Sequence, residues 1–203
     1  MRLEMFLDYR SAYSYLACHR LRQLDTEIDY RIVDLARVMK AVNNQPVPAC
    51  PSKQRYSALD VSRWAELYGI GFTPNRLMFE SMRSGQLEGA LLSRAGLAAQ
   101  QLGVFETFNG AMLTALWAGD DDIASEAGRS QFLERHDLPA SLFELSSAQA
   151  IIDRLSMHDD EAIERGVFGA PTFFVDGEMF FGNDRLPFVE ARLKGERKPG
   201  MVL

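Results

Sequence analysis

Residue patterns typical of β-strands occur only near the two ends of this 203-residue chain, and residues 36–165 between them are patterned as helices almost throughout. Residues 3–8 are apolar at alternate positions and partly apolar at the others, which predicts a strand that is covered on both faces. Apolar residues at helical spacing over residues 11–23 predict a helix, and residues 28–33 predict a second strand. A strand–helix–strand start favours a parallel strand pair joined by a crossover helix.

The other end carries a hairpin signal. Residues 172–175 and 178–181 are rich in β-forming side chains, and Asp176-Gly177 between them is a dipeptide favoured in two-residue hairpin turns. Residues 186–193 then predict a last helix. The second half of the pattern is therefore strand–strand–helix.

Each end is too small to fold alone, so we expect the two ends to combine in one four-stranded mixed sheet. This is the thioredoxin-like α/β fold (βαβ…ββα) with a large all-helical insertion. We assign residues 1–35 and 166–203 to a discontinuous thioredoxin-like domain and residues 36–165 to a helical insertion domain. The polar tail of residues 195–203 is expected to be loose.

Composition excludes several functional classes. The net charge of -6 argues against a general nucleic-acid binder, which needs clustered Lys and Arg. No segment approaches the roughly 20 apolar residues of a membrane span. The charged start of the chain does not resemble a signal peptide, so we expect a cytoplasmic protein.

The chain has no dithiol or metal motif. Its cysteines, Cys18 and Cys50, are far apart, and none of its three histidines lies at metal-ligand spacing. Cys18 is best interpreted as a small buried residue on a helix face. The acidic run at residues 120–122 is best interpreted as a solvated loop and helix cap, since no ligand cluster accompanies it.

Ser11 is the first candidate site residue. It stands at a strand-to-helix turn, where the backbone N–H groups of a helix start favour an anion. A serine hydroxyl cannot exchange disulfides, but it can donate a hydrogen bond to a thiolate from another molecule. The alternative is that Ser11 only caps the helix, because Ser is a preferred N-cap.

Two more candidate sites lie near the C-terminal end. Pro171 opens a strand directly after Ala170, which would suit a cis peptide bond that leaves the Ala170 backbone free to pair with an extended peptide ligand. A trans proline that simply starts the strand is the alternative. Asn183 and Asp184 precede the last helix and either cap it or receive the charged end of a γ-glutamyl group.

A fourth candidate site lies in the loop over residues 40–46. Asn44 in this loop and the nearby Lys53 could bind a carboxylate or amide, although an exposed lysine is usually only solvated. Phe72 and Trp117 are candidates for a substrate pocket in the helical segment, but aromatic side chains of this kind are more often core.

Several segments together resemble one family. FLDYRSAYSYLA resembles the family opening FDxxSPYSYLA, and MKAVNNQPVPACPSK resembles the loop with Asn-x-Pro and a following Lys. LWAGDDDI resembles a further stretch, and RGVFGAPTFFVDGEMFFGNDRL resembles the C-terminal signature nearly throughout. The family is that of 2-hydroxychromene-2-carboxylate isomerases and kappa-class glutathione transferases, in the DsbA-like thioredoxin superfamily. Ala12 departs from it, because the family commonly has Pro there, which pre-sets φ at a first helical position.

The resemblance implies a role for each candidate residue. Ser11 would activate glutathione, the cofactor. Ala170, before Pro171, would pair with the cysteinyl part of glutathione. The γ-glutamyl end would be held by Asn183 and Asp184, and the glycyl end would lie near Asn44 and Lys53. The resemblance also implies a homodimer.

The function expected from this resemblance is a glutathione-dependent isomerase. It would interconvert 2-hydroxychromene-2-carboxylate and trans-o-hydroxybenzylidenepyruvate-type compounds by reversible thiol addition, and its partner would be a small aromatic carboxylate. A kappa-class-like transferase that conjugates small electrophiles is the first alternative. A non-catalytic thioredoxin-fold binding or chaperone protein is the second. A DsbA-like dithiol oxidase is disfavoured, because the turn at Ser11 lacks both cysteines.

Overall fold

The computed structural model describes residues 2–195, so the predicted loose tail lies outside the described residues except for Gly195. Its strands are β1 (Leu3–Leu7), β2 (Ile28–Ile32), β3 (Thr172–Val175) and β4 (Glu178–Phe181). Its α-helices are α1 (Ala12–Leu21), α2 (Leu35–Ala41), α3 (Pro51–Tyr68), α4 (Arg76–Ser84), α5 (Gly89–Gln101), α6 (Phe105–Trp117), α7 (Glu126–Arg135), α8 (Leu142–Leu145), α9 (Gln149–Glu164) and α10 (Leu186–Leu193). Two short 3₁₀ helices, η1 (Val47–Ala49) and η2 (Asn183–Arg185), complete the order.

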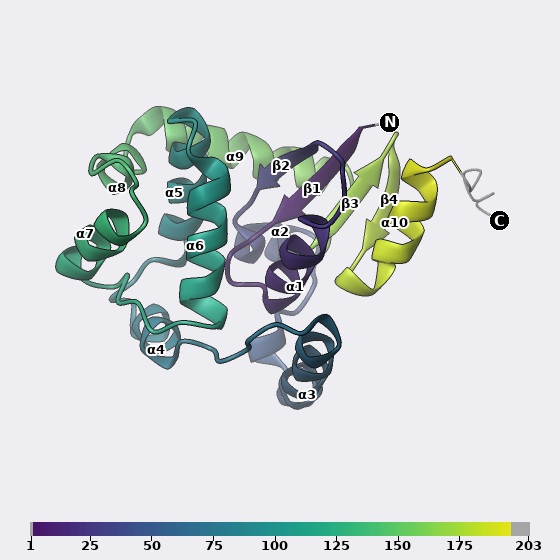
Figure 1. The fold of residues 1–203 in the computed structure, drawn as a ribbon, viewed down its shortest axis with the longest axis horizontal. Coiled ribbons are helices and arrows are strands. Elements are labelled where there is room, and N and C mark those ends of the chain that lie inside the picture. The colour runs from purple at the N-terminus through teal and green to yellow at the C-terminus, as the bar shows by residue number, and fades with distance from the viewer. Residues whose placement is uncertain (1, 196–203) are drawn as a thin grey trace.

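The four strands form one mixed sheet in the order β2-β1-β3-β4, as predicted (Figure 1). β1 pairs with β2 in parallel and with β3 antiparallel, and β3 pairs with β4 antiparallel. The β3–β4 turn has positive φ at both central residues, 48° at Asp176 and 84° at Gly177, which is the type I′ geometry that Asp-Gly favours.

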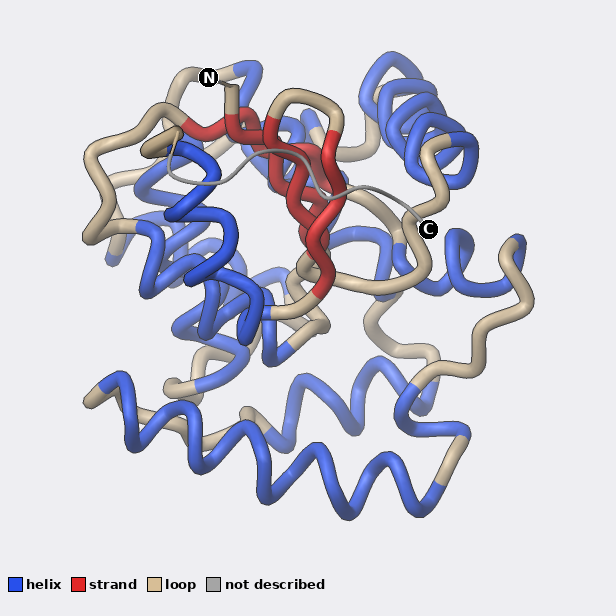
Figure 2. Tube along the Cα trace, turned by 90° about the vertical axis from the view of Figure 1, so that its right-hand side faces the viewer, coloured by secondary structure: helices blue, strands red, loops and turns tan. Residues whose placement is uncertain are grey.

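Helices cover both faces of the sheet, as Figure 2 shows from the side. On one face, Met5, Tyr30 and Phe173 occupy matching register positions and belong to the main core with residues of α1, α5, α6 and α10. On the other face, Phe6 and Phe174 form a second core cluster with residues of α2 and α9. This burial on both faces explains why β1 is apolar at nearly every position.

The helical segment does not have a separate core. Residues of α5, α6, α7 and α9 share the main cluster with the sheet. Gly96 of α5 brings that helix close to the sheet, because a Cβ there would lie 2.6 Å from the Tyr9 hydroxyl and 2.7 Å from Ile32 Cδ1. None of the helices within residues 2–195 is long and apolar enough to cross a membrane.

Two helices begin without a side-chain cap. α3 begins at Pro51, and its N-cap residue, Cys50, makes no side-chain cap bond. Proline is well tolerated at a first helical position, which suits Pro51. Asn183 and Asp184 do not cap α10, whose N-cap residue is Arg185, without a side-chain cap bond. Instead they lie in η2.

Replacing Gly96 with Ala tests the close packing of α5. We expect Gly96→Ala to lower the free energy of unfolding by about 1–3 kcal/mol, because the added methyl group overpacks a fully buried contact. Gly110→Ala on α6 is the matched control, since its Cβ would meet only the end of the exposed Arg22 side chain, which can move. Urea unfolding measures both variants, and equal effects would contradict this account of α5.

Candidate active site

The β1–α1 turn places Ser11 at the start of α1. The Ser11 N–H donates to the Asp8 carbonyl over 3.0 Å, which closes the turn. Ser11 is the N-cap residue of α1, and its Oγ accepts from the Ser14 N–H over 3.2 Å. Ser11 therefore caps α1, and the cap fixes its hydroxyl at the helix start, where backbone N–H groups favour an anion.

The Ser11 hydroxyl also reaches the C-terminal half of the chain. It donates a hydrogen bond of 2.7 Å to the carbonyl oxygen of Ala170. The Ala170–Pro171 peptide bond is cis. Ser11 and Ala170 are 8% and 7% exposed, so the contact is buried. The structure thus brings together two candidate sites that are 159 residues apart in the sequence.

The loop that contains Asn44 is joined by a hydrogen bond to the segment just before Ala170. Asn44 Nδ2 donates to the Phe168 carbonyl over 2.7 Å, and this carbonyl lies two residues before Ala170. Lys53 is exposed, and its Nζ donates to the Gln45 carbonyl over 3.1 Å. Asn44 therefore stands beside the segment before Pro171, and Lys53 holds the loop that carries Asn44.

Asn183 and Asp184 follow β4, whose end is tied to Pro171 by the Gly182 N–H, which donates to the Pro171 carbonyl over 3.0 Å. Asn183 is 2% exposed, and its Nδ2 makes no hydrogen bond of standard geometry among the described residues, although the Tyr68 side chain lies close enough to interact with it. Asp184 is exposed and pairs with Arg185 at 2.6 Å. A buried amide without a well-formed hydrogen bond is costly, so Asn183 can still donate to a ligand.

Sequence reasoning missed an ionic network that supports the turn. The buried Asp8 carboxylate accepts from the backbone N–H and Nε of Arg10, over 2.8 and 2.9 Å, and from the Leu35 N–H over 2.8 Å. The Arg10 guanidinium also pairs with Asp34, the N-cap residue of α2. A Cβ at Gly89 would lie 2.5 Å from Arg10 Nη1, so the guanidinium lies against the start of α5. Arg10, next to Ser11, thereby joins the turn to two helices.

An aromatic group on α1 and α3 was also missed. Tyr13, Trp64 and Tyr68 are partly buried and pack against the same small core cluster around Leu16. The Tyr13 hydroxyl donates to Asp60 over 3.0 Å, and burial raises the pKa of Tyr13 to about 12. The i, i+4 spacing of Trp64 and Tyr68 was the available signal, because it puts both rings on one face of a helix.

The predicted pocket pair, Phe72 and Trp117, forms a stacked contact with ring centroids 6.0 Å apart. Trp117 is 8% exposed and donates its indole N–H to the Tyr9 carbonyl over 2.8 Å, so this α6 side chain stabilises the β1–α1 turn. Phe72 is partly buried and touches both the main core and the cluster around Leu16. Phe72 is therefore the member of the pair with surface to offer a ligand.

The cysteines play no visible part in the site. Both are free. Cys18 is 2% exposed, and burial raises the pKa of its thiol to about 12. Within residues 2–195, no group of three or more His, Cys, Asp or Glu side chains is arranged to hold a metal ion. The turn at the start of α1 holds no cysteine, so a thiolate bound there would come from another molecule.

Comparisons with known proteins agree with this fold. Residues 2–194 match the family model of the DSBA-like thioredoxin domain. A 2-hydroxychromene-2-carboxylate isomerase of Pseudomonas sp. (strain C18) is 32% identical over 95% of this chain and 90% of that protein. Glutathione S-transferase kappa 1 of Caenorhabditis elegans is 25% identical over 93% of this chain and 88% of that protein. A solved structure of 2-hydroxychromene-2-carboxylate isomerase has a TM-score of 0.81 at 27% identity, covering 97% of this chain and 96% of its own. The predicted thioredoxin-like fold class is confirmed.

A double-mutant cycle tests the ionic support of the turn. Removing Arg10 leaves the buried Asp8 charge with fewer partners, so we expect Arg10→Met to lower the free energy of unfolding by about 2–3 kcal/mol; this allows for the partial exposure of the guanidinium. Adding Asp8→Asn should recover part of that loss, because the uncompensated charge is gone. Urea unfolding of the wild type, both single variants and the double variant measures the coupling. Simple additivity of the two changes would contradict the network.

The α2–α9 contact should make stability depend on pH. Burial raises the pKa of Asp159 to about 6, above its ordinary value of about 3.9. Between these values the folded state holds the extra proton, so the free energy of unfolding should fall as pH rises from about 4 to about 6, by at most about 3 kcal/mol. Asp159→Asn keeps an oxygen for the Asp34 N–H and removes the titration. Urea unfolding across this pH range should show a smaller decrease in the variant, and an identical decrease would refute the assignment.

Proposed function

We propose, from the premise that this chain belongs to the DsbA-like thioredoxin family, that it is a glutathione-dependent isomerase of 2-hydroxychromene-2-carboxylate-type aromatic carboxylates. The observation that carries the proposal is the Ser11 hydroxyl, held at the start of α1 within 2.7 Å of the Ala170 carbonyl. A cysteine here would make a disulfide oxidoreductase, whereas a serine suits a guest thiol. The isomerase of strain C18, at 32% identity, supports the reaction class.

Glutathione would bind along the segments that meet at Pro171. The Ala170 backbone would pair with the cysteinyl residue in the manner of an added strand. The amide of the buried Asn183 and the carboxylate of Asp184 would hold the γ-glutamyl end. Asn44 and Lys53 would lie near the glycyl end, where Lys53 retains N–H donors beyond its one bond to Gln45.

Binding would also release the hydroxyl that activates the thiol. In the structure the Ser11 proton is committed to the Ala170 carbonyl. Once that carbonyl accepts the cysteinyl N–H of glutathione, the Ser11 hydroxyl is free to turn and donate to the sulfur. A charge-assisted hydrogen bond and the helix start together would lower the thiol pKa by roughly one to two units from about 8.5, so roughly a quarter to three quarters of bound glutathione would be thiolate at pH 7.

The thiolate would act as a nucleophile that is regenerated. When bound, glutathione would supply a thiolate that adds reversibly to a conjugated carbon of the open keto form, allows rotation about the former double bond and is released unchanged. The ring form would reach that keto form by breaking its hemiketal C–O bond, with the hydroxyl proton passing to the phenol oxygen.

The first alternative is a transferase in which the same thiolate stays attached to an electrophile. The 25% identity to glutathione S-transferase kappa 1 favours it as the second candidate, and conjugation of a chloronitrobenzene would identify it. A non-catalytic thioredoxin-fold binding protein would bind glutathione without turning over either substrate.

Compartment and assembly complete the proposal. We place the protein in the cytoplasm, where thiols are kept reduced, in keeping with its two free cysteines. We also propose a homodimer. Sedimentation of the purified protein measures the latter directly.

The Ser11→Ala variant tests the function. Wild-type protein with glutathione should interconvert 2-hydroxychromene-2-carboxylate and its opened form, followed by ultraviolet absorbance. Loss of one hydrogen-bond donor to a charged sulfur should lower kcat/KM by about 10- to 100-fold. Glutathione should still bind, measured by calorimetry, and the pKa of the bound thiol should rise.

Ser14→Ala is the matched control. Ser14 is fully buried one turn further along α1, and its hydroxyl has no partner among the described residues. This variant removes a hydroxyl from the same helix without touching Ala170, so activity should stay near wild type. No glutathione-dependent change in wild type would remove the isomerase assignment, and equal activity in wild type and Ser11→Ala would remove the role proposed for Ser11.

A further inference from the structure

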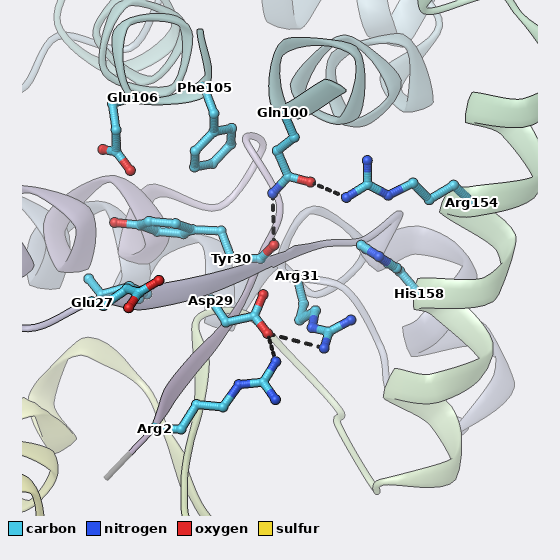
Figure 3. Close-up of a pocket in the computed structure, with 11 residues that line it drawn as sticks. Arg2, Glu27, Asp29, Tyr30, Arg31, Gln100, Phe105, Glu106, Arg154 and His158 are labelled. Carbon is cyan, nitrogen blue, oxygen red and sulfur yellow. Dashed lines mark hydrogen bonds and ion pairs between the residues drawn. The ribbon is translucent and has the colours of Figure 1, made fainter. Parts of the chain in front are cut away.

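A cavity of about 590 Å³ lies along the outer edge of β2, away from the Ser11 site. Strand β2 is an edge strand of the sheet, and the cavity is bordered by the end of α5, the start of α6 and the middle of α9. Its size is in the range of small-molecule sites. Figure 3 shows Arg154 and His158 reaching into it from α9 and Gln100 from α5.

The side chains at this edge are held in place by the strand itself. Gln100 Nε2 donates to the Tyr30 carbonyl over 2.9 Å, and His158 Nδ1 lies 3.1 Å from the Ile32 carbonyl. These two carbonyls face away from β1, so they would otherwise be the acceptors for a further strand. The cavity is therefore not a strand-addition site, and its polar side chains are preorganised.

Arg154 is a cation without an anion. No carboxylate of residues 2–195 lies within 4.0 Å of its guanidinium, and its one hydrogen bond, of 2.7 Å, is to the neutral Gln100 Oε1. The nearby Asp29 is already shared between Arg2 and Arg31. Burial and the neighbouring Arg31 lower the pKa of Arg154. A partly buried guanidinium normally has a partner, so donors of Arg154 are open to an anion.

The rest of the cavity limits what that anion can be. Phe105 is partly buried and lies on Tyr30, with ring centroids 5.0 Å apart, so the two rings offer an apolar wall. Glu27 and Glu106 lie at the other end of the cavity from Arg154 (Figure 3). These carboxylates disfavour a ligand with negative charge at both ends, such as a nucleotide or a dicarboxylate.

We propose that this cavity binds a small aromatic monocarboxylate, with its carboxylate on Arg154 and its ring beside Phe105 and Tyr30. The site is separate from the Ser11 site and does not depend on the proposed reaction. A guanidinium fork matches a carboxylate in two parallel hydrogen bonds. Gln100 positions the Arg154 guanidinium, because its Oε1 accepts from Arg154 while its Nε2 donates to the Tyr30 carbonyl.

Calorimetry with benzoate as the probe tests the site. We expect wild-type protein to bind benzoate, and Arg154→Gln to weaken this binding at least about tenfold, because a charged hydrogen-bond partner is lost. Arg154→Lys keeps the charge without the fork and should give an intermediate affinity; it also serves if Arg154→Gln fails to fold. Arg83→Gln, on the exposed surface of α4, is the matched control and should bind like wild type.

The same variants separate this proposal from the proposed function. Glutathione binding should be equal in wild type and in both Arg154 variants, and any benzoate bound at the Ser11 site would remain in all of them. The proposal is overturned if wild type does not bind benzoate, or if Arg154→Gln and Arg154→Lys both bind it as wild type does. Neither result would bear on the isomerase assignment.

Discussion

The pairing of β1 with strands from both ends of the chain determines everything else in this structure. Along the chain, only α1 separates β1 from its partner β2, whereas the whole helical segment separates β1 from its other partner, β3. The antiparallel register Phe6↔Thr172 puts the end of β1 beside the start of β3. The turn after β1 and the peptide bond before β3 therefore meet, which is why Ser11 touches Ala170. Without that register the start of α1 would be an ordinary helix cap.

Local patterns carried much of the fold. The elements Thr172–Val175, Glu178–Phe181 and Leu186–Leu193 were predicted with the bounds that the structure has, because Asp176-Gly177 fixes the hairpin between the strands. The alternative that failed was the capping of α10 by Asn183 and Asp184. Residue type favoured Asn183 as a cap, but the chain forms a 3₁₀ turn there and buries the Asn183 side chain.

The site divides in the same way. Ser11 and Ala170 were identified as candidates from the sequence motifs that contain them, and a hydrogen bond joins the two residues in the structure. The support of the turn could not be predicted, because Asp8, Arg10 and Asp34 are joined only when the helical segment folds back over the sheet. The sequence also could not predict that Arg154 lacks a carboxylate partner. Asp29 forms its ion pairs with Arg2 and Arg31, and these pairs depend on the tertiary structure.

Cys18 shows why position, rather than residue type, decides where sulfur chemistry can occur on α1. It lies on the same helix as Ser11, two turns further along, and its thiol pKa is raised to about 12 by burial. The favourable field of a helix start falls off within the first turn, so it gives this thiol little help. Ser11 stands where the field is strongest, but it has no sulfur. The chain thus separates its own thiol from the place that would activate one, and a thiol brought by a ligand is the chemistry that remains for the start of α1.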